Sequence, residues 1–293
     1  MKLAHESILT ELSASGKLPT PAGVALTILE LARDADTSTE DIALVLKGDP
    51  ALSGQILKYA NSAASGVREE VSTVNDALVR LGMKMVQQLC LGLSVLSNTR
   101  HGKCDGFNYS RYWSRSLARA IGCQVLSPLI PSVNAEEGFT CGLLVGIGGL
   151  GLASVYPQEY TEILTEWNNG TPAKRTSLET AELSINRHEV TCALFEDWRL
   201  PGYFGEAALL RDRTEWPAPP DDWNHLELRE RLTRLLYAAE LAAGICLTAD
   251  REQDRLVLRY LEIGHSLGIP EQGWAKQFDL IAAEWDRMGR VLE

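Results

Sequence analysis

One glycine-rich segment has the spacing of a phosphate-binding loop. Gly146-Ile147-Gly148-Gly149-Leu150-Gly151 matches the pattern GxGxxG. In dinucleotide-binding folds these glycines follow a strand and begin a long helix, so that the backbone can approach a pyrophosphate group. Here the surrounding residues have a helical pattern, and Pro157 comes soon after Gly151. We therefore expect neither nicotinamide nor flavin binding, and the sequence predicts no cofactor.

Cysteine is the second residue type with possible chemistry. The six cysteines are widely separated and include no CxxC pair: they are Cys90, Cys104, Cys123, Cys141, Cys192 and Cys246. Most of them stand among apolar residues in helical segments. This setting predicts buried free thiols in a reducing cytoplasm, rather than a disulfide framework or a zinc site.

The elements that must position these residues have helical periodicity. In the first hundred residues, Thr20-Pro21 and Asp49-Pro50 each combine an N-cap residue with a proline in the first turn. The segment 37–40 predicts a capping box in which the Glu40 carboxylate bonds back to the cap. A further helix is expected from Ser72, with Gly82 as its left-handed stop, and another over 85–96.

The rest of the chain continues in the same way, with no segment typical of a strand. Helices are predicted over 112–126, 136–145, 157–167, 177–187, 188–198, 226–247, 251–267 and near 274–288. A polar segment with two glycines, within 98–110, separates the halves. We therefore predict an all-α protein with one helical bundle over residues 1–105 and a second over residues 106–293.

Composition excludes several classes of protein. The chain has 293 residues, of which 45% are hydrophobic, so it can form a substantial core. Its formal net charge of −11 argues against nucleic acid or an anionic membrane as the main partner. No signal peptide or membrane span is predicted, because the longest apolar candidate, 143–155, is short and glycine-rich.

An ordered set of short motifs resembles the HDOD domain family. The motifs are Leu18-Pro19-Thr20-Pro21, Gly48–Leu52, Leu57–Ser62, Val71-Ser72, Ala77–Gly82, Trp113–Ala118, Glu137–Leu144 and Trp198–Pro201. The resemblance extends over roughly residues 15–265, and the order and spacing of the set are more specific than any single motif. It implies an N-terminal helical bundle packed on a degenerate helical bundle of the HD type.

The HDOD family is related to the HD metal-dependent phosphohydrolases, which hold a divalent metal through a His, a contiguous His-Asp pair and a later Asp. The resemblance places Arg115, Val145-Gly146 and Glu240 at these positions, and His188 is retained. Valine and glycine side chains offer no donor atom, and an arginine repels a cation. We therefore predict that the chain is not an enzyme and binds no metal.

Several of these residues allow two interpretations. Arg115 either pairs with a carboxylate such as Glu240 across the vacated pocket or points to solvent. His188 is either a residual ligand or a structural residue of the bundle, and we favour the second. Asn61 and Ser62 either satisfy carbonyl groups at a helix end, which we favour, or form a polar contact between the two halves.

The first functional hypothesis is a non-enzymatic regulator of bacterial signal transduction in the cytoplasm. The resemblance implies contacts in trans with response regulators, sensor kinases or cyclic di-GMP enzymes, and we expect no nucleic-acid or membrane partner. The groove between the bundles and the segment containing Trp216 and Trp223 are candidate interfaces, although each tryptophan can equally pack its own loop onto the protein. The alternatives are a nucleotide sensor that uses the vacated pocket and a residual metal-dependent phosphohydrolase. The oligomeric state is not predicted.

Overall fold

In a computed structural model of the protein, the described residues are 12, 14–19, 24–31, 36–61, 71–99, 101–198, 200–210, 225–248, 251–267 and 269–288. All regular elements within these ranges are helices. The all-α fold class predicted from the helical periodicity is confirmed.

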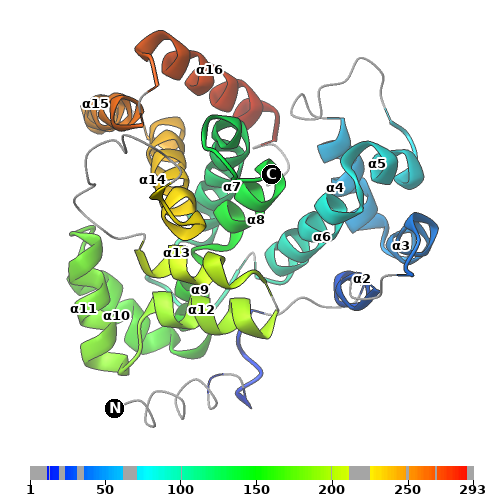
Figure 1. The fold of residues 1–293 in the computed structure, drawn as a ribbon. Coiled ribbons are helices and arrows are strands. Elements are labelled where there is room, and N and C mark those ends of the chain that lie inside the picture. The colour runs from blue at the N-terminus through cyan, green and yellow to red at the C-terminus, as the bar shows by residue number, and fades with distance from the viewer. Residues whose placement is uncertain are drawn as a thin grey trace.

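The first group of helices gathers on one side of the molecule (Figure 1). Its members are α2 (Val24–Leu31), α3 (Thr39–Leu46), α4 (Pro50–Ala60), α5 (Val74–Leu81) and α6 (Met83–Asn98). Helix α6 contacts α2, α4 and α5, and α3 contacts α2 and α5. Apolar residues at helical spacing, such as Ile42, Leu46 and Ile56, are fully buried between them.

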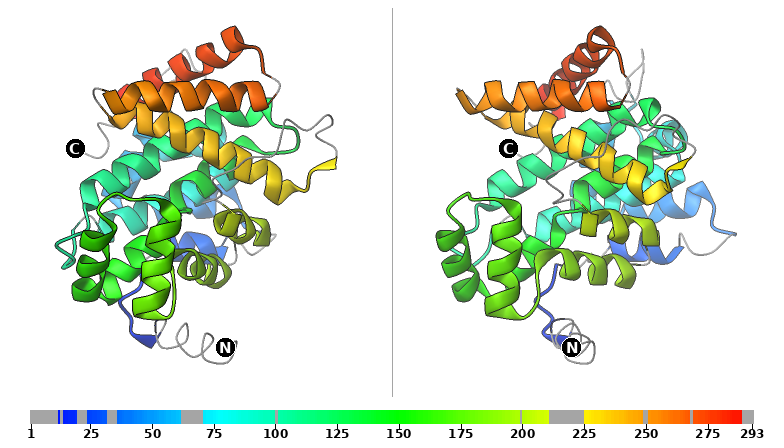
Figure 2. Two further views of the ribbon diagram at one scale, coloured as in Figure 1. Left: turned by 90° about the vertical axis from the view of Figure 1, so that its left-hand side faces the viewer. Right: turned by 60° about the vertical axis from the view of Figure 1, so that its left-hand side comes forward.

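The second group is arranged around α7 (Tyr109–Leu126). Its other members are η2 (Ser127–Leu129), α8 (Ala135–Leu144), α9 (Ile147–Val155), α10 (Pro157–Trp167), α11 (Pro172–Leu183), α12 (Arg187–Asp197), α13 (Gly202–Leu210), α14 (Leu228–Leu247), α15 (Arg251–Ser266) and α16 (Glu271–Met288). Helix α7 contacts α8, α14 and α16, while α12 contacts α9 and α13. Helices α15 and α16 lie at the opposite end of the molecule from α10 and α11 (Figure 2).

The two groups meet where α6 contacts α8. Lys84 Nζ lies 2.7 Å from Glu137 Oε1 across this contact. Burial alone would raise the pKa of Glu137, but its hydrogen bonds with Lys84 and Tyr203 outweigh that effect and lower it. The predicted division at residues 105 and 106 falls in the connection between α6 and α7.

The helix predicted over 177–187 is α11, which begins five residues earlier, at Pro172, and ends at Leu183. Two other predicted starts are wrong by one residue. Helix α3 is capped by Ser38, and Asp41 rather than Glu40 accepts a hydrogen bond from the cap backbone. Both registers have the spacing of a capping box, but the Thr37 hydroxyl donates to the Leu31 carbonyl 2.7 Å away and is not the cap. Helix α5 likewise begins after Thr73, whose hydroxyl accepts from the backbone of Asp76, and not after Ser72. The Asp49-Pro50 start of α4 and the stop at Gly82 are confirmed.

Two helices have no counterpart among the predicted ones, α9 and α13. Every residue of α9 from Ile147 to Ala153 is buried, and three of them are glycines. A helix that is apolar on all sides lacks the polar stripe that periodicity detects, and glycine is a poor helix former. Tertiary packing therefore determines α9, not local preference.

One stretch, Ala135–Val155, has the length and hydropathy of a membrane span. In the fold it is two helices, α8 and α9, separated at Gly146, and 83% of its apolar window is buried inside the protein. This stretch is a core segment. All six cysteines are free thiols, as predicted, and burial raises the pKa of Cys90 and of Cys123 to about 12.

Glycines allow the neighbours of α7 to approach it closely. A Cβ atom on Gly142 of α8 would lie 2.9 Å from the Cα atom of Ala120, and one on Gly122 would lie 3.0 Å from the Cβ atom of Ala239 in α14. Real Cβ atoms essentially never approach within the first of these distances. The small residues therefore fix the separation of α7 from α8 and α14.

We expect the substitution Gly142→Ala to destabilise the protein by about 1–3 kcal/mol, because the added methyl group meets backbone atoms that cannot move independently. Urea denaturation followed by circular dichroism measures this loss. Gly54→Ala in α4 is the matched control: nothing lies within 4 Å of the added atom, so the change should be neutral or stabilise by up to about 1 kcal/mol. Equal stability of the two variants would contradict the close contact of α7 and α8.

Candidate functional site

A cavity of about 470 Å³ opens beside α7. It is bordered by α7, α14, the amino ends of α9, α11 and α12, and the end of α10. Three aromatic residues line it, Phe107, Tyr112 and Trp167. Its size is within the range of small-molecule pockets, about 300–1,000 Å³.

Helix α7 contributes three arginines to the cavity. Arg111, Arg115 and Arg119 are four residues apart, so they occupy one face of the helix. Like charges at this spacing repel one another, and the arrangement requires compensation from another element.

Glu240 of α14 supplies that compensation. Arg115 Nε donates to Glu240 Oε1 at 2.5 Å, and Arg119 Nη1 donates to Glu240 Oε2 at 2.8 Å. Arg119 Nε also donates to the carbonyl oxygen of Gly142 at 2.6 Å. One carboxylate thus bonds two guanidinium groups, and Arg119 links it to α8. The pair of Arg115 with Glu240, one of the two interpretations above, is present in the structure.

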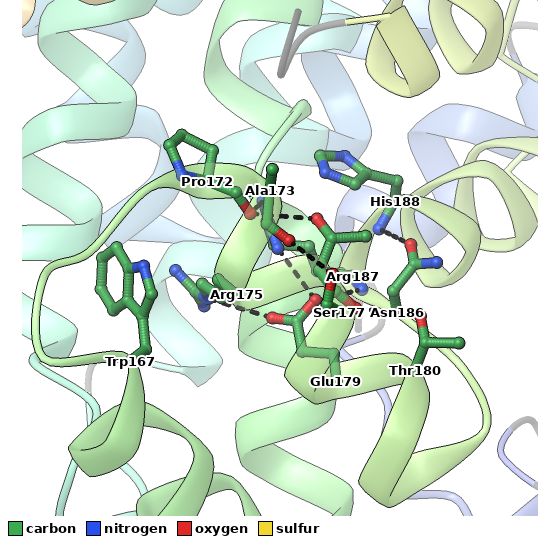
Figure 3. Close-up of polar contacts among 12 residues, drawn as sticks. Trp167, Pro172, Ala173, Arg175, Ser177, Glu179, Thr180, Asn186, Arg187 and His188 are labelled. Atoms are coloured by element: carbon green, nitrogen blue, oxygen red, sulfur yellow. Dashed lines mark hydrogen bonds and ion pairs between the residues drawn. The ribbon is translucent and has the colours of Figure 1, made fainter. Parts of the chain in front are cut away.

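A second carboxylate, Glu179 of α11, is fully buried and faces Arg175 and Arg187, which line the cavity (Figure 3). Its Oε1 accepts from Arg175 Nε at 3.0 Å and from the Tyr160 hydroxyl at 2.9 Å. Its Oε2 accepts from Arg187 Nη1 at 2.9 Å and from the backbone N–H of Arg187 at 3.0 Å. Because that N–H begins α12, the carboxylate also satisfies a helix-end donor that has no intrahelical partner.

Burial raises the pKa of Tyr160, so the neutral phenol donates to Glu179 while it accepts from Arg175. Burial alone would lower the pKa of Arg175, but Tyr160 and Glu179 outweigh it and raise that pKa. The Arg175 guanidinium also lies 5.1 Å from the centre of the Trp167 ring, within the range of a cation–π contact. Arg175 and Arg187 are therefore held in fixed positions at the cavity wall.

The glycine-rich segment begins α9 and follows α8, with no strand before it, as expected. Gly146 is the N-cap of α9 and lines the cavity with Gly149. A Cβ atom on Gly148 would lie 1.8 Å from the carbonyl oxygen of Arg187, so glycine is required for α9 to pack on α12. On Gly149 it would lie 3.3 Å from Arg175 Nη2.

The other residues at the expected metal-ligand positions lie elsewhere. Val145 is buried in the core, and neither it nor His188 is among the cavity's lining residues. His188 is in the first turn of α12, where its backbone N–H donates to the Asn186 side chain at 3.0 Å, and its ring points away from Glu179 (Figure 3). Arg115, Gly146 and Glu240 line the cavity together.

This donor set does not fit a divalent metal. Within the described ranges, no three His, Cys, Asp or Glu residues are placed to hold an ion. Among the described residues that line the cavity, Glu240 is the one carboxylate, and it is bonded to two guanidinium groups. The charges therefore favour an anion over a cation.

The remaining candidate residues lie away from the cavity. Asn61 is at the C-terminus of α4, and its side chain exchanges two hydrogen bonds with the backbone of Val71, at 2.7 and 2.8 Å. Both partners belong to the first group of helices. Ser62, Trp216 and Trp223 lie outside the described residues.

The predicted site residues did not include the buried carboxylate or four of the arginines that line the cavity. These residues are Glu179, Arg111, Arg119, Arg175 and Arg187. The spacing of 111, 115 and 119 is a signal in the sequence, because it places three cations on one face of a predicted helix. The contribution of α11 and α12 has no such signal, since it depends on how distant helices pack.

We expect Glu179→Gln to destabilise the protein by about 3–5 kcal/mol, because the amide leaves two guanidinium groups without their buried counter-charge. Chemical denaturation measures the change. Glu182→Gln, on the exposed face of the same helix, is the control and should stay within about 0.5 kcal/mol of the parent protein. A loss below 1 kcal/mol for Glu179→Gln would show that this cluster does not hold α11 and α12 as described.

Comparisons with known proteins agree with this architecture. The crystal structure of the MmoQ response regulator from Methylococcus capsulatus str. Bath is 32% identical, covers 89% of this chain and 98% of its own, and has a TM-score of 0.55. An HDOD domain protein of unknown function from Geobacter sulfurreducens is 19% identical, covers 98% of this chain and 97% of its own, and has a TM-score of 0.67, which supports the fold alone.

An uncharacterized protein of Treponema pallidum (strain Nichols) is 28% identical over 186 residues, which are 59% of this chain and 34% of that protein. The chain therefore matches about a third of the length of this relative. The HDOD domain itself matches residues 18–213, which include α7 and the ends of α9, α10, α11 and α12 around the cavity, while α14 lies beyond the match. On these grounds the chain belongs to the HDOD domain family.

Proposed function

We propose that this protein is a non-enzymatic regulator of bacterial signal transduction that acts in the cytoplasm through contacts with other proteins. The observation that carries the proposal is an ion pair between two positions at which the resemblance leads us to expect metal ligands. Arg115 stands at the first expected ligand position and bonds Glu240, which stands at the last. Without a metal, the phosphohydrolase reaction lacks the group that polarises phosphate and activates water.

Family membership supports the signalling part of the proposal. A relative that covers 89% of this chain is described as a response regulator, and it is 32% identical. Fold-level similarity is a weaker basis for function than a site, so the partner must be identified by experiment. The proposed partners are response regulators, sensor kinases or enzymes of cyclic di-GMP metabolism.

A second candidate function, a small-molecule sensor, is favoured by the arginine-lined cavity. The two functions are compatible, because a ligand that binds one conformation better shifts the population that a partner protein meets.

A bacterial two-hybrid screen with the full chain tests the first function. We expect a signalling protein among the partners, and loss of that interaction in the double variant Trp216→Ala, Trp223→Ala. Leu258→Ala, an exposed apolar position on α15, is the control and should retain it.

Two outcomes would contradict the proposal. One is a screen that yields no signalling protein. The other is turnover of a phosphodiester by the purified protein in the presence of Mn²⁺, with loss of that activity in Glu240→Gln, which would support a residual phosphohydrolase instead.

A further inference from the structure

We propose that the cavity beside α7 binds a nucleotide that carries two or more phosphate groups. The inference extends the sensor function and is independent of the partner-protein function. It rests on the charge of the cavity wall, the fixed position of its guanidinium groups, and the aromatic residues beside them.

The cavity wall has an excess of positive charge. Five arginines line it, and two carboxylates, Glu240 on the wall and the buried Glu179, form ion pairs with four of them. Five positive charges against two negative ones leave a net charge of +3, in a protein whose overall formal charge is −11. A positive region in an acidic protein argues for a specific anionic ligand, and two phosphate groups carry about three negative charges near neutral pH.

The guanidinium groups are already held in place. Glu240 orients Arg115 and Arg119, and Glu179 orients Arg175 and Arg187 through the contacts given above. The side chains of Arg119, Arg175 and Arg187 are 3%, 18% and 11% exposed, so little conformational freedom is left to lose when a ligand binds. Guanidinium groups bind phosphate oxygens through paired, charge-assisted hydrogen bonds.

The amino end of α9 adds to the positive electrostatic potential of the cavity. Gly146 and Gly149 bring the start of this nine-residue helix to the cavity, and the N-cap Gly146 has no side chain to cap it, although the N–H of Gly148 donates to Thr191 Oγ1 at 3.0 Å. The positive end of a helix dipole favours phosphate. The glycine-rich segment, which we rejected as a dinucleotide fingerprint, thus contributes to an anion site of a different architecture.

The organic part of the ligand is assigned from the aromatic residues. Phe107, Tyr112 and Trp167 share the cavity with the arginines. Planar bases stack on aromatic rings and on guanidinium planes. Inorganic phosphate would use only the arginines, whereas a nucleotide would use both kinds of side chain.

Isothermal titration calorimetry of the full chain with guanosine 5′-diphosphate tests the proposal. We expect one site per chain, affinity that weakens as the salt concentration rises, and a higher melting temperature at millimolar ligand. Sodium pyrophosphate, which lacks the base, should bind more weakly, and guanosine, which lacks the phosphates, should not bind measurably.

Arg111→Gln is the most informative variant, because Arg111 lines the cavity but forms no ion pair with any described residue. Losing one charge-assisted hydrogen bond should weaken guanosine 5′-diphosphate binding by about tenfold or more, while the unfolding transition stays unchanged. Arg255→Gln, exposed on α15 and outside the cavity lining, is the matched control and should bind like the parent.

The following results would overturn the proposal. No heat and no thermal shift with either guanosine 5′-diphosphate or pyrophosphate would exclude the anion site, as would equal weakening by Arg111→Gln and Arg255→Gln. Equal affinity for pyrophosphate and guanosine 5′-diphosphate would show that the base does not contribute to binding. The aromatic side chains would then not recognise a base, and the assignment of the ligand as a nucleotide would be wrong. None of these results depends on whether a partner protein is found.

Discussion

The site depends on the ion pairs that the Glu240 carboxylate forms with Arg115 and Arg119. It reaches from α14 to α7, and Arg119 continues the contact to the Gly142 carbonyl of α8. The three helices can meet at this point because Gly122 and Gly142 leave no Cβ atom between them. Small residues set the distance between the helices, and the ion pairs then fix their register.

Buried and partly buried ion pairs add little net stability, because desolvation of the charges offsets their attraction. Here the ion pairs fix the positions of the arginine side chains. Glu240 and Glu179 each hold two arginines, so four of the five cations that line the cavity are kept in fixed positions. The related hydrolases use a metal to join ligands from several helices. In this chain, carboxylate–guanidinium pairs join α7 to α14 and α11 to α12.

Much of the fold could be predicted from the sequence because helix starts are encoded locally. Asp49 with Pro50 is such a short-range signal and acts within one turn, whereas the similar signal of Thr171 with Pro172 was missed, because that helix was predicted to begin at 177. Helix α9 could not be predicted in this way, because its residues are apolar on every side and glycine-rich. Its conformation is determined by the close packing of Gly148 on α12.

The candidate site could be predicted only in part, for a related reason. The resemblance to the HDOD family identified Arg115, Gly146 and Glu240 as neighbours, since a family pattern carries information about tertiary contacts. Arg175, Arg187 and Glu179 have no place in that pattern, and 60 residues or more separate the first two from Arg115. Their convergence follows from the packing of α10, α11 and α12, which no local rule describes.

The central claim is that guanidinium groups have replaced a metal in this cavity. A crystal structure of the protein, from crystals grown with both MnCl₂ and guanosine 5′-diphosphate, would test this claim most directly. Anomalous scattering identifies manganese independently of the phosphate density. The account predicts phosphate density against the arginines of α7, α11 and α12, with the bond from Arg115 to Glu240 intact and no anomalous peak in the cavity. A manganese peak beside Glu240, with Arg115 displaced from it, would contradict the account.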